Sequence, residues 1–393
     1  MLDQREIRNN IDKFVYDLID YTLANDASDI HIEPEESYAR IRLRIDGRLV
    51  EILRINKENY QMLITKIKLM ANMDIAEHRR PQDQSLKLKG FDMIDFRVSS
   101  IGTINGEKLV IRVLSVFSFE KRANLLGFSE TSKEILQKAI KNKSGMIIFS
   151  GPTGSGKSTS LYALLNKLNN DNDNIITIED PVEYNICGIN QININEKIDF
   201  TFANALRSIL RQDPDIIMVG EIRDKETAQI AIRAAITGHL VLTTLHTNNA
   251  LSSIIRLKDL GIADYLLSSA INALASQRLV RKLCSCKKED TMTDLEYQIA
   301  RKYMDIPRDT KIYRPNGCPN CMDGYKGREA IEEVFLITDE FRDLIREGKI
   351  DLVSLNTYAE KNQFKSMAYN GLGKVFDGRT SFEEIMRVIY DQI

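Results

Sequence analysis

The sequence lacks a long apolar run, an excess of charge of either sign and an apolar N-terminal segment. Its longest uncharged stretch, residues 234–255, is interrupted by threonine, histidine and asparagine, so we expect no membrane-spanning helix. The formal net charge is only -2, and without an overall basic field no binding to nucleic acid is expected. Because the N-terminus lacks the apolar core of a signal peptide, we expect a cytoplasmic protein with only peripheral membrane contact.

Cysteine is also scarce, and four of the five cysteines form two close pairs, Cys284-Ser-Cys286 and Cys318-Pro-Asn-Cys321. In a reducing compartment such pairs indicate metal ligation before disulfides. The second pair has the form of a zinc knuckle, and four thiolates would make a structural zinc site with no position left for substrate. The first pair is one residue shorter than the usual Cys-x-x-Cys, so four reduced thiols remain the alternative. Cys187 stands apart and is expected in the core.

The chain has 393 residues, of which 43% are hydrophobic. This is enough for two or three domains with sizeable cores. Apolar residues at helical spacing predict an amphipathic helix from Ile7 to about Asn25. Alternation around Asp46-Gly47 predicts a β-hairpin with one apolar face and one basic, solvated face. We expect residues 1–114 to form a small α+β domain, with a further helix at 57–70 and strands at 96–98 and 109–113.

The regular pattern lapses over residues 115–129, which we interpret as a linker. Beyond it, short apolar strands alternate with helices, which is typical of a parallel sheet covered by helices. The strands are predicted at 146–149, 174–178, 216–219 and 240–245. The expected α/β domain spans residues 130–393, with a cysteine-bearing insertion at 284–325 and C-terminal helices at 326–393.

Residues 151–159, Gly-Pro-Thr-Gly-Ser-Gly-Lys-Ser-Thr, lie between an apolar run and a helical run. This is the G-x-x-x-x-G-K-S spacing of a P-loop, in which glycines let backbone N–H groups approach phosphates and the next helix presents its positive end. A glycine-rich turn with a stray Lys-Ser pair is the weaker alternative. Lys157 is expected at the β- and γ-phosphates and Ser158 on Mg²⁺. The predicted nucleotide site consists of Gly151, Pro152, Thr153, Gly154, Ser155, Gly156, Lys157, Ser158 and Thr159.

Acidic clusters follow two of the predicted strands, at residues 179–183 and 221–224. Ligand sites of parallel sheets lie at the carboxyl ends of the strands, so these acids are expected to face the same phosphates. One acid would orient Mg²⁺ and another the attacking water. A single strand-end glutamate could equally be a helix cap or part of a surface ion pair.

Two arginines and two histidines are weaker candidates. Arg207 and Arg211 share one face of a predicted helix and could stabilise charge on a transferring phosphoryl group, although by themselves they favour a solvated face. His239 and His246 flank the strand at 240–245 and could sense phosphate, whereas a strand-end histidine is more often only hydrogen-bonded.

Together these motifs resemble those of the ATPases of type II secretion and type IV pilus assembly, over nearly the whole chain. Residues 151–158 match that family's Walker A motif, and 216–224 resemble its Walker B motif. Residues 178–184 are similar to its aspartate box and 237–248 to its histidine box. Further similarity, to the family's second N-terminal domain, lies in residues 28–34 (Ser-Asp-Ile-His-Ile-Glu-Pro), 42–47 and 79–83.

The resemblance implies a RecA-like P-loop ATPase domain with a smaller α+β N-terminal domain. It implies that Glu183 is the general base and that Glu221 orients Mg²⁺. The four cysteines and residues 371–384 resemble the assembly and secretion branch, and the chain is expected to begin at the second N-terminal domain. The family's phosphate-facing arginines correspond to Arg97, Arg112, Arg207 and Arg211.

The expected function is therefore Mg²⁺-dependent ATP hydrolysis that powers assembly of a type IV pilus or a type II secretion pseudopilus. The resemblance implies a homohexamer that acts on an inner-membrane platform protein, at the inner face of the cell membrane. A competence pseudopilus or a retraction-type motor of the same family is the alternative, and a nucleic-acid motor fits the charge balance poorly. A scaffold that binds ATP without turnover is disfavoured by the intact Lys157, Glu183 and Glu221.

Overall fold

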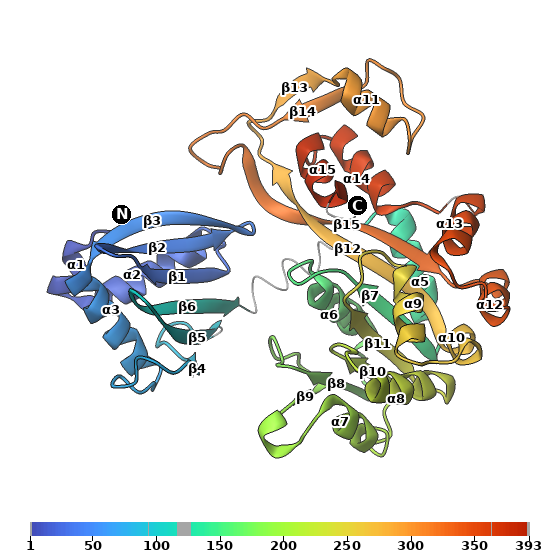
Figure 1. Ribbon diagram of the computed structural model, residues 1–393, viewed down its shortest axis with the longest axis horizontal. Coiled ribbons are helices and arrows are strands. Elements are labelled where there is room, and N and C mark those ends of the chain that lie inside the picture. Colours follow the sequence, from blue (N-terminus) through green and yellow to red (C-terminus); the bar gives the residue numbers. More distant parts are fainter. Residues whose placement is uncertain (1, 93, 116–126, 363, 391–393) are drawn as a thin grey trace. The chain divides into compact units, whose positions relative to one another are not determined.

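The computed structural model describes residues 2–92, 94–115, 127–362 and 364–390. The chain divides into two compact units, Met1–Lys121 and Arg122–Ile393, which are drawn as ribbons in Figure 1. Most of the linker expected at 115–129 falls on residues 116–126, outside the described residues. No helix in the described parts of the chain is both long and apolar enough to cross a membrane.

The first unit is an antiparallel sheet of six strands in the order β3-β2-β1-β6-β5-β4, packed against helices. Its apolar core joins the buried side of the strands to residues of α2 and α3, including Phe14, Leu18, Leu63 and Ile67. The elements are α1 (Arg5–Asn9), α2 (Ile11–Ala24), β1 (Asp29–Pro34), β2 (Tyr38–Ile45), β3 (Arg48–Asn56), α3 (Lys57–Met70), β4 (Gln82–Leu86), β5 (Ile94–Thr103) and β6 (Gly106–Ser115).

Local sequence signals explain the first part of this unit. The predicted hairpin is confirmed: Asp46 (φ 48°) and Gly47 (φ 85°) form the two-residue turn between β2 and β3. The predicted helix at 57–70 is confirmed as α3. The single helix predicted from Ile7 is wrong, because Asn10 interrupts it and caps α2 by accepting a hydrogen bond from Lys13 N.

The basic face of the hairpin is ion-paired, which corrects the expectation of a solvated face. Arg42 Nη2 lies 2.7 Å from Glu33 Oε2 on the neighbouring strand β1, and Lys108 Nζ lies 2.9 Å from Glu33 Oε1. Burial raises the pKa of Glu33, but the hydrogen bonds from Arg42 and Lys108 outweigh it and hold the pKa at about 2. This carboxylate therefore stays ionised and ties three strands together.

The second unit is built on a sheet of seven strands in the order β15-β12-β7-β11-β10-β8-β9. Strands β12 to β9 in this order are parallel, and β15 runs antiparallel to β12. The four predicted strands are confirmed as β7 (Gly145–Ser150), β8 (Ile175–Glu179), β10 (Ile216–Val219) and β11 (Leu240–Leu245). Their carboxyl ends lie at one edge of the sheet.

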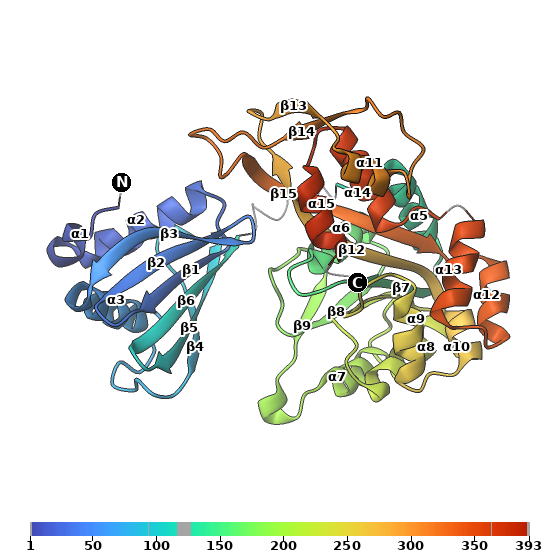
Figure 2. The same ribbon diagram turned by 45° about the horizontal axis from the view of Figure 1, so that its top comes forward.

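Helices cover both faces of this sheet (Figure 2). Apolar residues of α7 (Phe202–Ile209), α8 (Lys225–Ile236), α9 (Ser252–Asp259), α10 (Asp264–Ala270), α12 (Asp339–Arg346) and α13 (Leu352–Lys361) join one core on one face. Helices α5 (Glu130–Ile140) and α6 (Lys157–Leu168) lie on the other side. The remaining elements are β9 (Asn190–Asn193), η1 (Glu196–Ile198), β12 (Ile271–Leu283), β13 (Lys288–Thr291), α11 (Asp294–Ala300), β14 (Lys311–Arg314), β15 (Tyr325–Leu336), α14 (Met367–Phe376) and α15 (Phe382–Tyr390).

The expectation that residues 326–393 are helical is wrong at its start, because Tyr325–Leu336 forms the edge strand β15. This strand pairs with β12 along nearly its whole length. Its outer edge is covered by α14, where Asn370 Nδ2 donates to Glu332 O at 2.8 Å and Lys374 Nζ donates to Ala330 O. The side-chain donors of α14 thus satisfy carbonyl groups that an uncovered edge would expose.

Candidate functional site

The P-loop connects β7 to α6 and packs against β12. Gly151 (φ +145°) and Gly156 (φ +90°) have backbone conformations that favour glycine. A Cβ atom on Gly151 would lie 2.6 Å from Gln277 O, and one on Gly156 would lie 2.7 Å from Gln277 Nε2. Only glycine therefore lets the loop approach β12 so closely.

Lys157 is the first residue of α6, and its side chain is only 8% exposed. Its Nζ donates to Gly151 O at 2.8 Å and to Pro152 O at 3.0 Å. Burial lowers the pKa of Lys157 to about 8, an effect that the charge of Glu221 opposes and that of Arg278 reinforces. A buried cation thus lies inside the loop, beside an acid from another strand.

The residues of the loop fit the phosphates of a nucleoside triphosphate. Ser155 Oγ is buried and has no hydrogen-bond partner within the described structure, at a typical cost of about 1–3 kcal/mol unless a ligand satisfies it. The N-terminus of the twelve-residue helix α6 follows directly and favours an anion. Ser158, in the first turn of α6 and exposed, is the hydroxyl available to hold Mg²⁺.

Glu221 and His246 meet at the same edge of the sheet. Glu221 comes two residues after β10, and His246 directly follows β11. The His246 Nε2 atom lies 3.1 Å from Glu221 Oε2, and Arg223 pairs with the other carboxylate oxygen. Thr244 Oγ1 donates to Gly220 O at 2.7 Å, which fixes the two strand ends together. The structure therefore brings Lys157, Glu221 and His246 to one place.

The two glutamates of the first acidic cluster have different environments. Glu179 is buried, accepts hydrogen bonds from Thr177 Oγ1 at 2.6 Å and from Tyr162 Oη, and has its pKa raised by burial. Tyr162 Oη in turn accepts from Glu183 N at 3.2 Å. The Glu183 side chain is exposed. Glu179 thus holds the backbone of the segment that presents Glu183.

The remaining candidates have other surroundings. His239 is at the opposite end of β11 from His246, where its Nδ1 lies 3.0 Å from Ala234 O. Arg207 pairs with Glu226, and Arg211 Nη1 donates to Arg207 O at 2.8 Å. Two further candidates, Arg97 and Arg112, belong to strands β5 and β6 of the first unit.

Two buried residues of β12 beside the P-loop were not found by sequence reasoning. Gln277 Oε1 accepts from Ser160 Oγ at 2.6 Å, and Arg278 Nη2 donates to Asn248 O at 3.0 Å. The available signal was a Ser-Gln-Arg tripeptide within the apolar run of residues 271–280. Polar side chains inside an apolar strand indicate a buried polar contact.

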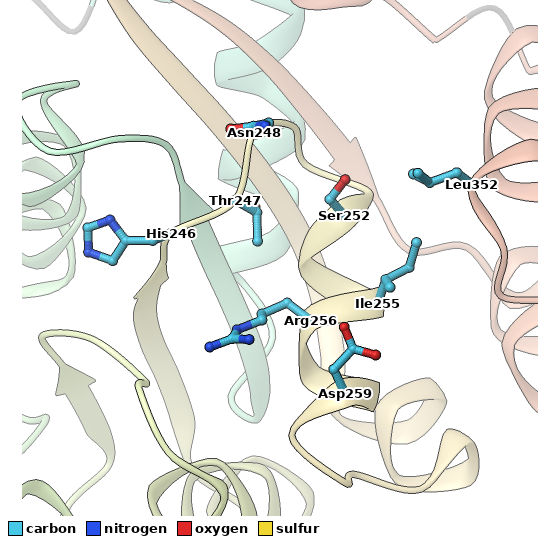
Figure 3. Close-up of a pocket in the computed structure, with 8 residues that line it drawn as sticks. All are labelled: His246, Thr247, Asn248, Ser252, Ile255, Arg256, Asp259 and Leu352. Carbon is cyan, nitrogen blue, oxygen red and sulfur yellow. The ribbon is translucent and has the colours of Figure 1, made fainter. Parts of the chain in front are cut away.

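A cavity of about 290 Å³ lies beside His246. Figure 3 shows His246, Thr247 and Asn248 on the loop after β11, with Arg256 among the residues of α9 and Leu352 of α13 across the space. The loop that carries His246 is therefore open to a cavity on one side.

The four paired cysteines form a second cluster, at the base of the segment that holds β13, α11 and β14. Their sulfur atoms all lie within 4.8 Å of one another. Cys284 Sγ is 3.9 Å from Cys318 Sγ, and Cys286 Sγ is 3.7 Å from Cys321 Sγ. This arrangement can hold a metal ion. Cys187, expected in the core, is exposed instead, because it lies in the turn before β9.

The fold and the edge that carries Lys157, Glu221 and His246 define a P-loop nucleoside triphosphatase. The chain belongs to the type II/IV secretion system protein family, whose model matches residues 4–387. It is thus an ATPase, and its RecA-like domain and smaller α+β domain agree with the expected class.

Particular relatives are similar over most of the chain. It is 48% identical to a putative type II secretion system protein E of Escherichia coli K12, over 92% of this chain and 73% of the relative. It is 44% identical to the type IV pilus assembly ATPase PilB of Acinetobacter baylyi, over 98% of this chain and 67% of the relative. The structure of the pilus retraction motor PilT with bound ADP has a TM-score of 0.64 at 27% identity, covering 94% of this chain and 95% of that one.

Gly156→Ala should weaken ATP binding by about 10-fold or more, because its Cβ would displace Gln277 and the loop and strain the positive φ. Gly154→Ala is the matched control: its φ is +77°, but no atom lies within 4 Å of the added carbon. Titration of both variants with a fluorescent ATP analogue measures the difference. Equal losses would show that backbone conformation alone, and not the approach to β12, sets the requirement for glycine.

Proposed function

We propose that this chain hydrolyses ATP with Mg²⁺ and couples hydrolysis to assembly of a type IV pilus or a type II secretion pseudopilus. The observation that carries the proposal is the meeting of buried Lys157 with Glu221 and His246 at the carboxyl edge of the sheet. Relatives from 42 to 48% identical are named for type II secretion or type IV pilus assembly, whereas the retraction motor PilT is 27% identical.

Each residue of the edge has a role suited to its surroundings. Lys157 and the loop N–H groups bind the phosphates, and Ser158 and Glu221 hold or orient Mg²⁺. Glu183 is exposed and ionisable, which suits the base that orients the attacking water. His246, bonded to Glu221, senses whether the γ-phosphate is present. His239 lies at the other end of its strand and has no role in this proposal.

Glu183→Gln should reduce ATP hydrolysis by about 10²-fold or more and leave ATP bound, because the amide keeps the size of the side chain but not its basicity. Single-turnover hydrolysis and retained nucleotide measure both effects, and the variant should fail to support fibre assembly in cells. Glu134→Gln, exposed on α5, is the control and should behave as wild type. Normal hydrolysis by Glu183→Gln would mean that the base is another residue.

Two arginines of the first unit, Arg97 and Arg112, are candidates to complete the ATP site in a homohexamer. Arg97 on β5 and Arg112 on β6 stand directly opposite each other, which places two guanidinium groups on one face of the sheet. Arg112 Nε lies 3.0 Å from Asp29 Oδ1 but its side chain is 62% exposed. We propose that these arginines, with Arg207 and Arg211, face phosphate in a homohexamer that acts on a membrane platform protein.

Arg97→Ala or Arg112→Ala should lower turnover by about 10-fold or more and change ATP binding little, because arginine charge matters most as the γ-phosphoryl leaves. Specific activity should rise with protein concentration as hexamers form. Arg48→Ala, exposed on the edge strand β3, is the control. Full activity in a verified monomer would rule out the shared site.

The cysteine cluster fits one structural zinc ion. Four sulfur atoms about 2.3 Å from one zinc lie about 3.8 Å from one another in a tetrahedral site, and three of the separations here are 3.5, 3.7 and 3.9 Å. The ligands are Cys284, Cys286, Cys318 and Cys321. The short first pair therefore does not prevent tetrahedral coordination.

Elemental analysis should find one zinc ion per chain, and Cys318→Ser should lower the zinc content severalfold, because three thiolates bind zinc more weakly than four. Cys187→Ser is the control and should keep its zinc. A chelator should increase hydrogen exchange in residues 284–325 before it affects the sheet. Metal-free protein with four reactive thiols and unchanged stability would contradict the site.

A further inference from the structure

The loop that carries His246, residues 246–251, is held by side chains from three neighbouring strands. Its first residue contacts Glu221, so the position of the loop bears directly on the ATP site. The contacts are Ser150 Oγ of β7 to Asn249 O at 3.3 Å, Arg278 Nη2 of β12 to Asn248 O at 3.0 Å, and Glu333 Oε1 of β15 accepting from Ala250 N at 2.7 Å.

Glu333 differs from the other two because it also bonds to a C-terminal helix. Its Oε2 accepts from Met367 N at 3.1 Å, and Met367 is the first residue of α14. The side chain of Glu333 is buried, with 7% of the residue exposed. Two oxygen atoms of one carboxylate therefore connect the backbone of the His246 loop to the start of α14.

The first residues of the loop also border the cavity shown in Figure 3. The loop is open to this cavity at His246, Thr247 and Asn248, whereas Ala250 and Leu251 are buried in the apolar core, so a displacement at His246 passes along a close-packed segment to Ala250. A shift of the loop would act on α14 through Glu333, because both hydrogen bonds belong to one rigid carboxylate group.

We propose that Glu333 is a positioning residue that couples the His246 loop to α14. A change of the nucleotide bound beside Glu221 then changes the position of α14. The inference rests on the proposed ATPase function of the same edge. It gives the ATP site a connection to α14 through β15.

Glu333→Gln breaks this connection with little change of volume. A carboxylate can accept from both N–H groups, whereas an amide has one acceptor oxygen and one NH₂ donor. The amide can therefore keep the bond to Ala250 or the bond to Met367, but not both.

Glu332→Gln is the matched control. Glu332 is the adjacent residue of β15 and is fully buried, and its Oε1 accepts from Ser129 N at 2.7 Å. Within the described residues, the other partner of its carboxylate is Lys374 of α14, whose Nζ lies 3.6 Å from Glu332 Oε2, and no hydrogen bond joins it to residues 246–251. The control thus changes a buried carboxylate that also contacts α14, through Lys374, but leaves the connection from Ala250 to Met367 intact.

The experiment measures hydrogen exchange of the full-length chain without nucleotide, with Mg²⁺ and ADP, and with Mg²⁺ and a non-hydrolysable ATP analogue. In wild type and Glu332→Gln, nucleotide should change exchange in residues 246–251 and 366–376 together. In Glu333→Gln, one of these two responses should be lost while the P-loop response remains. The turnover number should fall by about 5-fold or more, with nucleotide affinity nearly unchanged.

Persistence of both responses in Glu333→Gln would overturn the proposal, as would equal effects of the two glutamine variants. If Glu333→Gln fails to fold, the wild-type protein decides the question, because a nucleotide response in 246–251 without one in 366–376 excludes the coupling. Absence of any nucleotide response in the P-loop would instead contradict the proposed function itself.

Discussion

The buried charge of Lys157 is the constraint on which the site depends. Lys157 is only 8% exposed as a residue, and a buried ammonium group is costly unless oxygen atoms surround it; the carbonyl groups of Gly151 and Pro152 meet this need. Those carbonyls come within reach because glycine lets the loop pack against Gln277 of β12. Burial lowers the pKa of Lys157, and the charge of Glu221 opposes that effect. Glu221, which follows β10, therefore helps to keep the Lys157 ammonium group charged. The loop, strand β12 and the acid that follows β10 thus all bear on one buried cation.

Local sequence patterns predicted four of the seven strands of this sheet and the P-loop, because apolar runs, glycine spacing and caps act over a few residues. They could not predict β15. Glu332 and Glu333 give this segment the polarity of an exposed helix, yet both are buried and accept hydrogen bonds from Ser129, Ala250 and Met367. Those partners lie 34 to 203 residues away in the sequence, and no short pattern contains that information. The same holds for Gln277 and Arg278, whose polar groups meet the P-loop only in the folded sheet.

The sequence pattern also did not distinguish the surroundings of two nearby residues of the same type. Glu179 and Glu183 are four residues apart, but one is buried beneath Tyr162 and the other is exposed. His239 and His246 flank the same strand, and an extended strand of six residues places them at opposite edges of the sheet. In both pairs the difference is set by where the strand ends. Strand boundaries are what sequence patterns locate least well.

The C-terminal part of the chain cannot be separated physically from the ATP site, because both use strand β12. This strand carries Gln277 and Arg278 beside the P-loop and continues to Arg281, whose guanidinium group is paired with Glu384 of α15. Its end leads directly to Cys284 of the cysteine cluster. A buried ion pair that loses one partner is strongly destabilising, so α15 is fixed to β12 and moves with it. Any displacement of β12 during hydrolysis would therefore reach the helix and the cysteine cluster together.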